Sequence, residues 1–379
     1  MSAAPGPKQV TLVAHEVGTP GGMERQLAEL ASGLLEGGWE VTVIARSCAL
    51  PAHPALSFVR VGGPRRPFSL WYPWFFVFGS LAVHRHRAGL LHTTGALVLS
   101  RADLSTVHFC HEAFHRRAQG PRVARRSAAY RLNAWLAGWM SRLAERYCYR
   151  GPVTRRLIAV SDGVARELRR HFASVPVTVI PNGVDTDAFA PCASRRARLR
   201  AQLGVGANEL VALFVGGEWE RKGLRCAIEA VARAEGWHLV VVGSGDAERY
   251  RRLATEAGAG ERVHFEGVTA DPAPYYAGAD GFLLPTAYET FSLVTFEAAA
   301  AGLPLLVSRV SGVEEILVEG RNGWFIDMDP DAIARRLEAL TDEATRRAMG
   351  AAAREDSMRF GWDRAVESYD TLYRELMAD

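Results

Sequence analysis

The chain has 379 residues, too many for one ordinary hydrophobic core, and 48% of them are apolar, so we expect two globular domains. Its five cysteines are scattered and include no Cys-x-x-Cys pair, which argues against a disulfide framework or a zinc site and for a reducing compartment. The first eight residues lack the apolar core of a signal peptide. We therefore expect a cytoplasmic protein.

The net charge is only +3, but the basic residues are concentrated in one region. Residues 114–156 contain eleven arginines against a single acid, Glu145, so the rest of the chain is acidic on balance. Among the 45 basic residues only Lys8 and Lys222 are lysines. Because lysine and arginine differ in shape and hydration, a lysine at position 222 indicates either a site that needs a compact ammonium or a chance occurrence.

The first half of the chain alternates short apolar runs with helical patterns. A strand predicted at residues 10–14 leads into the glycine loop 15–22, and apolar residues at helical spacing follow this loop. Such a succession is typical of a doubly wound sheet. Further strands are predicted at residues 41–45, 90–92, 103–108, 157–160 and 177–180.

A turn at residues 181–185 and a polar stretch at residues 193–196, predicted to be a linker, precede a second set of strands. The pattern predicts an α/β protein with two Rossmann-like domains facing each other across a cleft. We expect an N-terminal domain over residues 1–190, a C-terminal domain over residues 191–355, and a final helix over residues 356–379 that packs back on the first domain. The second set of strands is predicted at residues 210–215, 239–242, 263–265, 281–284, 305–308 and 324–326.

The glycine and aspartate motifs exclude some chemistries. Neither Gly18-x-x-Gly21-Gly22 nor Gly243-Ser-Gly245 has the spacing of a dinucleotide fingerprint, which disfavours an NAD dehydrogenase. The triplets at residues 185–187 and 327–329 could hold a divalent cation with a diphosphate. Their positions, in a turn and before Pro330, favour backbone hydrogen bonds and helix capping instead, so we expect no metal site.

Two glutamates, Glu289 and Glu297, follow the apolar run that precedes Pro285. The pattern places Glu289 in a strand-to-helix loop and Glu297 about two turns into the helix. In an open parallel sheet, ligands bind beyond the carboxyl ends of the strands, where the N–H groups at helix N-termini face outward. A capped helix with a surface glutamate is the alternative for an isolated pair.

Four motifs in chain order resemble glycosyltransferase family 4, retaining enzymes of the GT-B fold, and the resemblance covers nearly the whole chain. Within the family, the chain looks most like the branch that glucosylates the lipopolysaccharide core and decorates antibiotics. It departs from the family at Gly217, where an arginine is usual, and at Thr290 and Ser292, where glycines are common. The motifs are Gly21–Arg25, Ile180–Asp185, Phe214–Gly216 with Arg221–Gly223, and Tyr288–Glu289 through Gly302–Pro304.

The resemblance implies a metal-independent hexosyltransferase that takes a UDP- or GDP-sugar and a hydroxyl acceptor, namely a glycolipid, a polysaccharide precursor or a natural product. The negative charge of the departing nucleoside diphosphate must be neutralised, and Lys222 and Arg221 would do this at the β-phosphate. Helix N-terminal amides would assist them. No cofactor is expected. The amides are those of Phe291, Ser292 and Leu293, in the loop that Thr290 narrows.

The resemblance also assigns the remaining contacts. Glu297 would accept the ribose hydroxyls, and Glu289 would lie by the sugar hydroxyls as nucleophile, electrostatic stabiliser or hydroxyl ligand. The backbone at Gly267 and Val268 would approach the base. In the first domain, His108 would meet the transferred sugar, although a lone histidine at a strand end is more often structural. Gly21 and Gly22 would let the backbone approach the donor or acceptor closely. The alternative is that the loop conformation alone requires these glycines.

The arginine-rich stretch, residues 114–156, also carries Trp135 and Trp139, a combination typical of an interfacial helix on an anionic membrane. The apolar run 68–83 contains Pro73 and is too short to span a bilayer comfortably. A core helix is its commonest explanation. We hypothesise that both segments dock on the inner face of the cell membrane or receive a phosphorylated or lipid-linked acceptor.

Two other function classes remain as alternatives. One is a catalytically inactive sugar-nucleotide fold that uses the arginines to bind nucleic acid or a membrane. Few recognisable nucleic-acid motifs support nucleic-acid binding, and the intact glutamate pair with Lys222 argues against an inactive fold. The other is a phosphorolytic enzyme, which would need a cofactor-lysine context that the sequence lacks.

Overall fold

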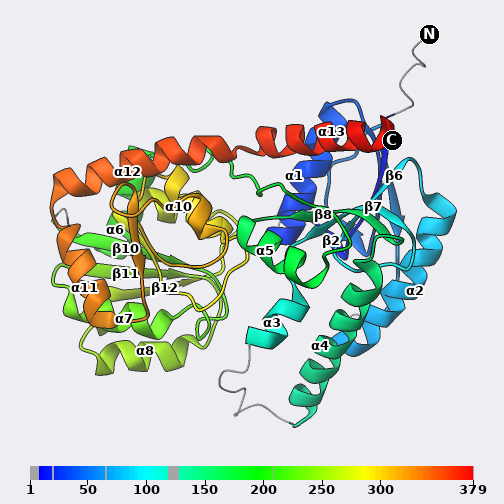
Figure 1. Ribbon diagram of the computed structural model, residues 1–379. Coiled ribbons are helices and arrows are strands. Elements are labelled where there is room, and N and C mark those ends of the chain that lie inside the picture. The colour runs from blue at the N-terminus through cyan, green and yellow to red at the C-terminus, as the bar shows by residue number, and fades with distance from the viewer. Residues whose placement is uncertain (1–7, 19–20, 65, 118–127, 207, 379) are drawn as a thin grey trace. The chain divides into compact units, whose positions relative to one another are not determined.

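A computed structural model of the chain describes residues 8–18, 21–64, 66–117, 128–206 and 208–378 (Figure 1). The chain forms two compact units. The first unit comprises Met1–Asn182 together with Trp362–Asp379, and the second comprises Gly183–Gly361. The chain thus passes between the units twice, near residue 182 and near residue 361, whereas the sequence suggested boundaries at residues 190 and 355.

The first unit is built on a parallel sheet with the strand order β5-β3-β1-β6-β7-β8-β9. Strand order reverses between β1 and β6, so the direction of chain winding changes at that point. A short parallel pair, β2 with β4, extends from the ends of β1 and β3. The strands are β1 (Gln9–Val13), β2 (Glu16–Val17), β3 (Glu40–Ala45), β4 (Ser47–Cys48), β5 (Leu56–Arg60), β6 (Leu90–Thr94), β7 (Ala102–Val107), β8 (Thr154–Ala159) and β9 (Val177–Val179).

The helices of the first unit include the last one of the chain, which packs on α1. Tyr373 contributes a buried ring to this core and its hydroxyl lies 2.6 Å from Nδ1 of His92 in β6. Trp39 Nε1 donates to Asp370 at 2.6 Å. The final helix is therefore an integral part of the first unit. The helices are α1 (Gly22–Glu36), α2 (Phe68–His86), α3 (His111–Arg117), α4 (Ala128–Cys148), α5 (Asp162–His171) and α13 (Trp362–Ala378).

The second unit contains a six-stranded parallel sheet in the order β12-β11-β10-β13-β14-β15. Its central strands are wholly buried, as expected for a parallel sheet covered by helices on both faces. The order reverses between β10 and β13, the Rossmann arrangement. The strands are β10 (Leu210–Val215), β11 (Trp237–Val242), β12 (Val263–Gly267), β13 (Gly281–Leu284), β14 (Leu305–Ser308) and β15 (Gly323–Ile326).

Helices flank this second sheet (Figure 1). Three short 3₁₀ turns, Gly260–Arg262, Val313–Glu315 and Met358–Phe360, lie between them. The helices are α6 (Ala193–Leu203), α7 (Leu224–Arg233), α8 (Ala247–Glu256), α9 (Ala273–Gly278), α10 (Leu293–Ala300), α11 (Pro330–Ala339) and α12 (Glu343–Ser357).

The predicted fold class, two Rossmann-like α/β domains, is confirmed, but the predicted linker at residues 193–196 is wrong. These residues begin α6. Arg196 and Arg200 of this helix reach the buried carboxylate of Asp280, at 2.6 and 3.0 Å. The helix therefore forms because its arginines have a distant partner, which composition alone does not reveal.

Candidate functional site

Two loops of the second unit meet where its strand order reverses. One follows β10 and contains residues 216–223, and the other follows β13 and contains residues 285–292. The Ala287 N–H donates to the Arg221 carbonyl at 2.9 Å. A Cβ on Gly223, whose φ is +72°, would lie 2.0 Å from the Pro285 carbonyl oxygen. Only glycine allows this approach, so the two loops are held together backbone to backbone.

An ion pair joins the two loops. Lys222 Nζ lies 2.7 Å from Glu289 Oε1, and both side chains are nearly buried, with 11% and 12% of their surface exposed. Thr286 Oγ1 donates to the same carboxylate oxygen at 3.2 Å. A buried ammonium is stable only with such a partner. The pair therefore fixes a positive and a negative group at the mouth of the sheet.

Arg221 adds a second cation to this cluster. Its Nη1 lies 3.3 Å from Glu289 Oε1 and also donates to the Tyr288 carbonyl. Its Nη2 pairs with the exposed Glu218 at 2.8 Å. The stem of Lys222 lies over Gly216, where a Cβ would come within 2.7 Å of it. The chain thus needs glycine at position 216 to seat this lysine.

Helix α10 begins directly after the second loop. Its N-cap, Ser292, has φ +64°, and its side chain accepts no hydrogen bond from a backbone N–H of the helix; its hydroxyl is 2.8 Å from Thr295 Oγ1 instead. The first N–H groups of any α-helix lack helical partners, so those of Leu293 and its neighbours face the loop. The Phe291 ring stacks on Phe296 with ring centroids 4.3 Å apart, which leaves only its backbone as a candidate ligand contact.

Glu297 lies on the second turn of α10 and is buried, with 7% exposed surface. Its Oε2 accepts a 2.7 Å hydrogen bond from the hydroxyl of Tyr276 in α9. Val268, by contrast, follows β12 and is 76% exposed. Gly217, where an arginine is usual in the family, would place a Cβ no closer than 3.5 Å to other atoms. The position therefore has room for a side chain that this sequence does not use.

His108 follows β7 in the first unit and is almost completely buried. Its Nε2 has no hydrogen-bond partner among the described residues, an unusual state that points to a function. Burial lowers the pKa of His108 from 6.5 to about 4, so the ring is neutral at pH 7. Burial also lowers the pKa of His111 to about 4. The unpaired nitrogen distinguishes His108 as the better candidate for ligand contact.

The predicted glycines of the first unit lie at the start of α1. Gly21 is its N-cap, with φ −145° and ψ 168°, and Gly22 is its first residue. A Cβ on Gly21 would meet only the flexible side chain of Glu24. The backbone therefore does not require glycine at position 21, unlike position 223.

The structure thus brings Arg221, Lys222 and Glu289 together and places Phe291 to Leu293 directly after them. His108, Gly21 and Gly22 belong to the first unit, and Thr290 lies between Glu289 and the helix. Sequence reasoning missed Thr286 and Tyr276, the hydroxyl partners of the two glutamates. Thr286 precedes Glu289 by three residues in the loop after β13, a spacing that could have indicated it.

The aspartate triplets have backbone roles. Asp185 Oδ1 accepts from the N–H groups of Asp187 and Ala188, at 3.2 and 2.8 Å. Asp329 caps α11 by accepting from the Asp331 N–H at 3.0 Å. These contacts agree with the turn and capping interpretations of the two triplets.

The apolar run 68–83 lies in α2 and most of the described part of the arginine-rich stretch lies in α4, and these two helices contact each other (Figure 1). Only part of α2 is core, because residues at helical spacing along it are exposed. Residues 118–127, near the beginning of the arginine-rich stretch, lie outside the described residues. Among the described residues, no helix combines the length and hydrophobicity needed to cross a bilayer. The exposed apolar residues are Leu70, Trp74, Val77, Phe78 and Leu81 of α2 and Leu132, Trp135, Trp139 and Leu143 of α4.

Two family models match the chain, and together they cover most of it. The model described as Glycosyltransferase Family 4 matches residues 20–188, and the model described as Glycosyl transferases group 1 matches residues 209–343. The strand orders and the paired loops define a protein with the GT-B architecture. The chain belongs to the glycosyltransferases that these two models describe, Glycosyltransferase Family 4 and Glycosyl transferases group 1.

Curated relatives are named as glycosyltransferases. D-inositol 3-phosphate glycosyltransferases from Acidothermus cellulolyticus and Streptomyces scabiei are 33% and 35% identical over 247 and 244 residues, in each case 59% of this chain and 54% of the relative. The chain thus matches about half the length of these relatives. An uncharacterized glycosyltransferase of Methanocaldococcus jannaschii is 28% identical over 380 residues, which are 94% of this chain and 95% of that protein.

Solved structures show the same fold. WaaG, a glycosyltransferase involved in lipopolysaccharide biosynthesis, aligns with a TM-score of 0.79 at 22% identity and covers 96% of this chain and 99% of its own. HepE from Anabaena, solved in complex with UDP-glucose, aligns with a TM-score of 0.72 at 19% identity over 96% and 99% of the two chains. At these identities the likeness concerns the fold alone.

We predict that His108 makes stability depend on pH. Between pH 6.5 and 5 the unfolded chain takes up a proton at His108 that the folded chain does not, so the free energy of unfolding falls as the pH falls, by at most about 1.4 kcal/mol per pH unit for this residue. Urea unfolding of wild type and His108→Gln from pH 8 to 5 should show a constant difference above pH 7. Below pH 6.5 the free energy of unfolding of the variant should rise relative to that of wild type. A difference independent of pH would contradict the buried neutral histidine.

Proposed function

We propose that the protein transfers a hexose-type sugar from a nucleoside diphosphate sugar to a hydroxyl acceptor with retention of anomeric configuration. The observation that carries this proposal is the Lys222–Glu289 pair at the strand-order reversal of the second unit. Open parallel sheets bind nucleotides at such a point. Family membership and the UDP-glucose complex of HepE support the same donor class.

Each part of the loop pair suits one part of the donor. An ammonium has three N–H donors, so Lys222 can hold Glu289 and a β-phosphate oxygen together. Arg221 and the amides at the start of α10 add further donors for the diphosphate. As these groups neutralise the departing charge themselves, we propose that transfer proceeds without a metal ion. Glu297 and Glu289 then accept hydroxyls of the ribose and of the sugar.

We propose that residues of the first unit contact the transferred sugar and the acceptor. The uncharged His108, with an unpaired buried nitrogen, offers a hydrogen-bonding group to the transferred sugar without adding positive charge where the anomeric carbon becomes cationic. The relatives named D-inositol 3-phosphate glycosyltransferase suggest a polyol phosphate as one acceptor class. Glycolipids, polysaccharide precursors and natural products remain within the proposed range.

We further propose that the protein works in the cytoplasm, bound to the inner face of the cell membrane through α2 and α4. Along α4 the exposed residues Leu132, Trp135, Trp139 and Leu143 recur every three or four positions, so they share one face. Arg85 at the end of α2 is exposed, and Arg142 of α4 is partly exposed. An apolar face with tryptophans and nearby arginines suits an anionic lipid surface.

The alternative of an inactive fold used as a nucleic-acid module is not favoured. Such a module would have no need for a buried lysine tied to a glutamate, because an unused buried ion pair is not a source of stability. An RNA mobility shift without donor turnover would revive this alternative.

The first prediction of the proposal concerns the chemical outcome. In the absence of an acceptor, the full chain should slowly hydrolyse one member of a panel of UDP- and GDP-hexoses. Nuclear magnetic resonance of the released sugar should show the anomer of the donor, and excess chelator should leave the rate unchanged. Predominantly inverted sugar, or a rate abolished by chelator, would refute metal-free retention.

A second prediction concerns Lys222. Loss of one preorganised donor to the leaving group costs about 3–4 kcal/mol in the barrier, so Lys222→Ala should lower donor turnover by about 10²–10³-fold. The matched control is Arg225→Ala, which removes a 69%-exposed cation on α7. Equal rates of donor turnover in the two variants would show that Lys222 is not part of the donor site, provided that circular dichroism shows both variants to be folded.

A third prediction concerns membrane docking. Trp135→Ser with Trp139→Ser should reduce flotation with anionic vesicles by at least about tenfold, because burial of one large apolar side chain contributes about 1.5–3 kcal/mol. Val318→Ser with Met358→Ser, which alters exposed apolar residues of the second unit, is the control. Flotation of wild type that depends on neither anionic lipid nor salt would argue against the docking face.

A further inference from the structure

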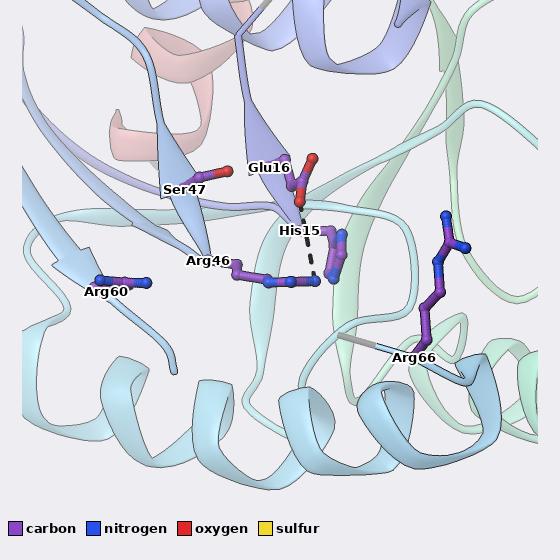
Figure 2. Close-up of a pocket in the computed structure, with 6 residues that line it drawn as sticks. All are labelled: His15, Glu16, Arg46, Ser47, Arg60 and Arg66. Atoms are coloured by element: carbon purple, nitrogen blue, oxygen red, sulfur yellow. Dashed lines mark ion pairs between the residues drawn. The ribbon is translucent and has the colours of Figure 1, made fainter. Parts of the chain in front are cut away.

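A pocket of about 430 Å³ lies in the first unit and plays no part in the donor site described above. Figure 2 shows Arg46 extending beside His15 towards Glu16, with Arg60 and Arg66 on opposite sides of Arg46 in this view. The pocket is lined by His15, Glu16, Arg46, Ser47, Arg60 and Arg66.

Sheet topology brings these residues together from a long stretch of sequence. His15 follows β1, Arg46 follows β3 and Arg60 ends β5. These three strands are neighbours in one parallel sheet, so their carboxyl ends share an edge. Arg66 precedes α2, and Trp71 of that helix covers the His15 ring with centroids 3.8 Å apart. The pocket therefore lies on the ligand-binding edge of an open sheet.

The positive charge of the pocket is poorly neutralised. Among the described residues that line the pocket, Glu16 is the only acid, and it approaches Arg46 no closer than 4.0 Å. Among the described residues, neither Arg60 nor Arg66 has an ion pair or a hydrogen bond from its guanidinium. Three guanidiniums thus face one carboxylate, while the Arg46 side chain is only 17% exposed. One largely buried guanidinium with a distant carboxylate, beside two exposed guanidiniums without partners, is suited to a doubly charged oxyanion.

Arginine is the residue best matched to such an anion. Its planar fork donates two parallel hydrogen bonds to the oxygens of a phosphate. The Ser47 hydroxyl can donate another, and the imidazole of His15 offers a hydrogen-bonding nitrogen. Burial lowers the pKa of His15, so its ring adds hydrogen-bonding capacity rather than charge near pH 7. The described residues of the lining thus offer many donors and a single carboxylate.

We propose that this arginine pocket binds a phosphate monoester carried by the acceptor, an inference that rests on the glycosyl transfer proposed above. The phosphate can belong to a soluble polyol or sugar phosphate or to a phospholipid headgroup. In either case the arginines would orient the acceptor by its charged end and leave a hydroxyl for transfer. The pocket would therefore select acceptors by charge.

Calorimetry tests this proposal on the full chain. Glycerol 3-phosphate and inorganic phosphate are titrated in the presence of saturating UDP, which occupies the Lys222 site. Arg60→Gln with Arg66→Gln should weaken the binding of both by about tenfold or more, because hydrogen bonds to charged groups are among the strong ones. The control, Arg170→Gln with Arg198→Gln, removes the same charge at two exposed positions outside the pocket and should bind like wild type.

The outcomes separate this proposal from the glycosyl transfer itself. UDP binding and acceptor-free donor hydrolysis should be the same in wild type and in the pocket variant. If wild type shows no UDP binding or no acceptor-free donor hydrolysis, that result would count against the transfer reaction. Phosphate binding that is absent, or equal in the two double variants, would overturn the pocket assignment while donor hydrolysis persists.

A vesicle experiment identifies the source of the phosphate. Binding to phosphatidylcholine vesicles with and without phosphatidic acid is compared for the same two double variants. A lipid phosphate predicts that only the pocket variant loses the phosphatidic acid dependence. A soluble phosphate predicts that both variants bind these vesicles equally, while the glycerol 3-phosphate titrations still differ.

Discussion

The reversal of strand order between β10 and β13 is the constraint on which the site depends. Because chain winding changes direction there, the loops after the two strands have no helix between them and meet directly. Gly223 and Pro285 touch backbone to backbone, and Lys222 and Glu289 then pair across the contact. A buried pair of this kind adds little net stability. Its value is that a cation and a carboxylate are held in fixed positions before a donor arrives.

The first unit uses the same topology with different chemistry. Its strand order also reverses, between β1 and β6, yet the cations at the carboxyl ends of β3 and β5 are arginines, Arg46 and Arg60, rather than a lysine. Lysine at position 222 lies against Gly216, where the compact ammonium on a slim stem fits. The arginines line an open pocket in which a planar fork can reach an anion from the side. The chain thus places its rare lysine where space is short.

Local sequence predicted the elements that are buried on both faces and missed those that depend on distant partners. All twelve predicted strands are present, and most of them are nearly continuously apolar, as strands covered by helices must be. Strand β5 was missed because Leu56–Arg60 has no buried residue: Leu56 and Val59 are half-buried and the other three are exposed. Residues 193–196, predicted to be a linker, begin a helix because the helix arginines pair with Asp280. The partner of Glu297, Tyr276, is likewise distant in the sequence. The arginine pocket combines residues 15 to 66, which no local pattern connects.

The substitutions at Thr290 and Ser292 are compatible with this site for a reason that lies in the neighbouring loop. Gly312, which follows β14 with φ +85°, lies so close that a Cβ would meet the backbone of Phe291 at 2.3 Å. The backbone of Gly312 therefore fixes the position of the loop before α10. Among the described non-glycine residues of this loop, only Ser292 has a positive φ. That conformation costs a serine about 1–2 kcal/mol, which its hydrogen bond to Thr295 partly offsets. The direction of the amides at residues 291–293 is thus set by backbone contacts, and glycine is dispensable at position 290.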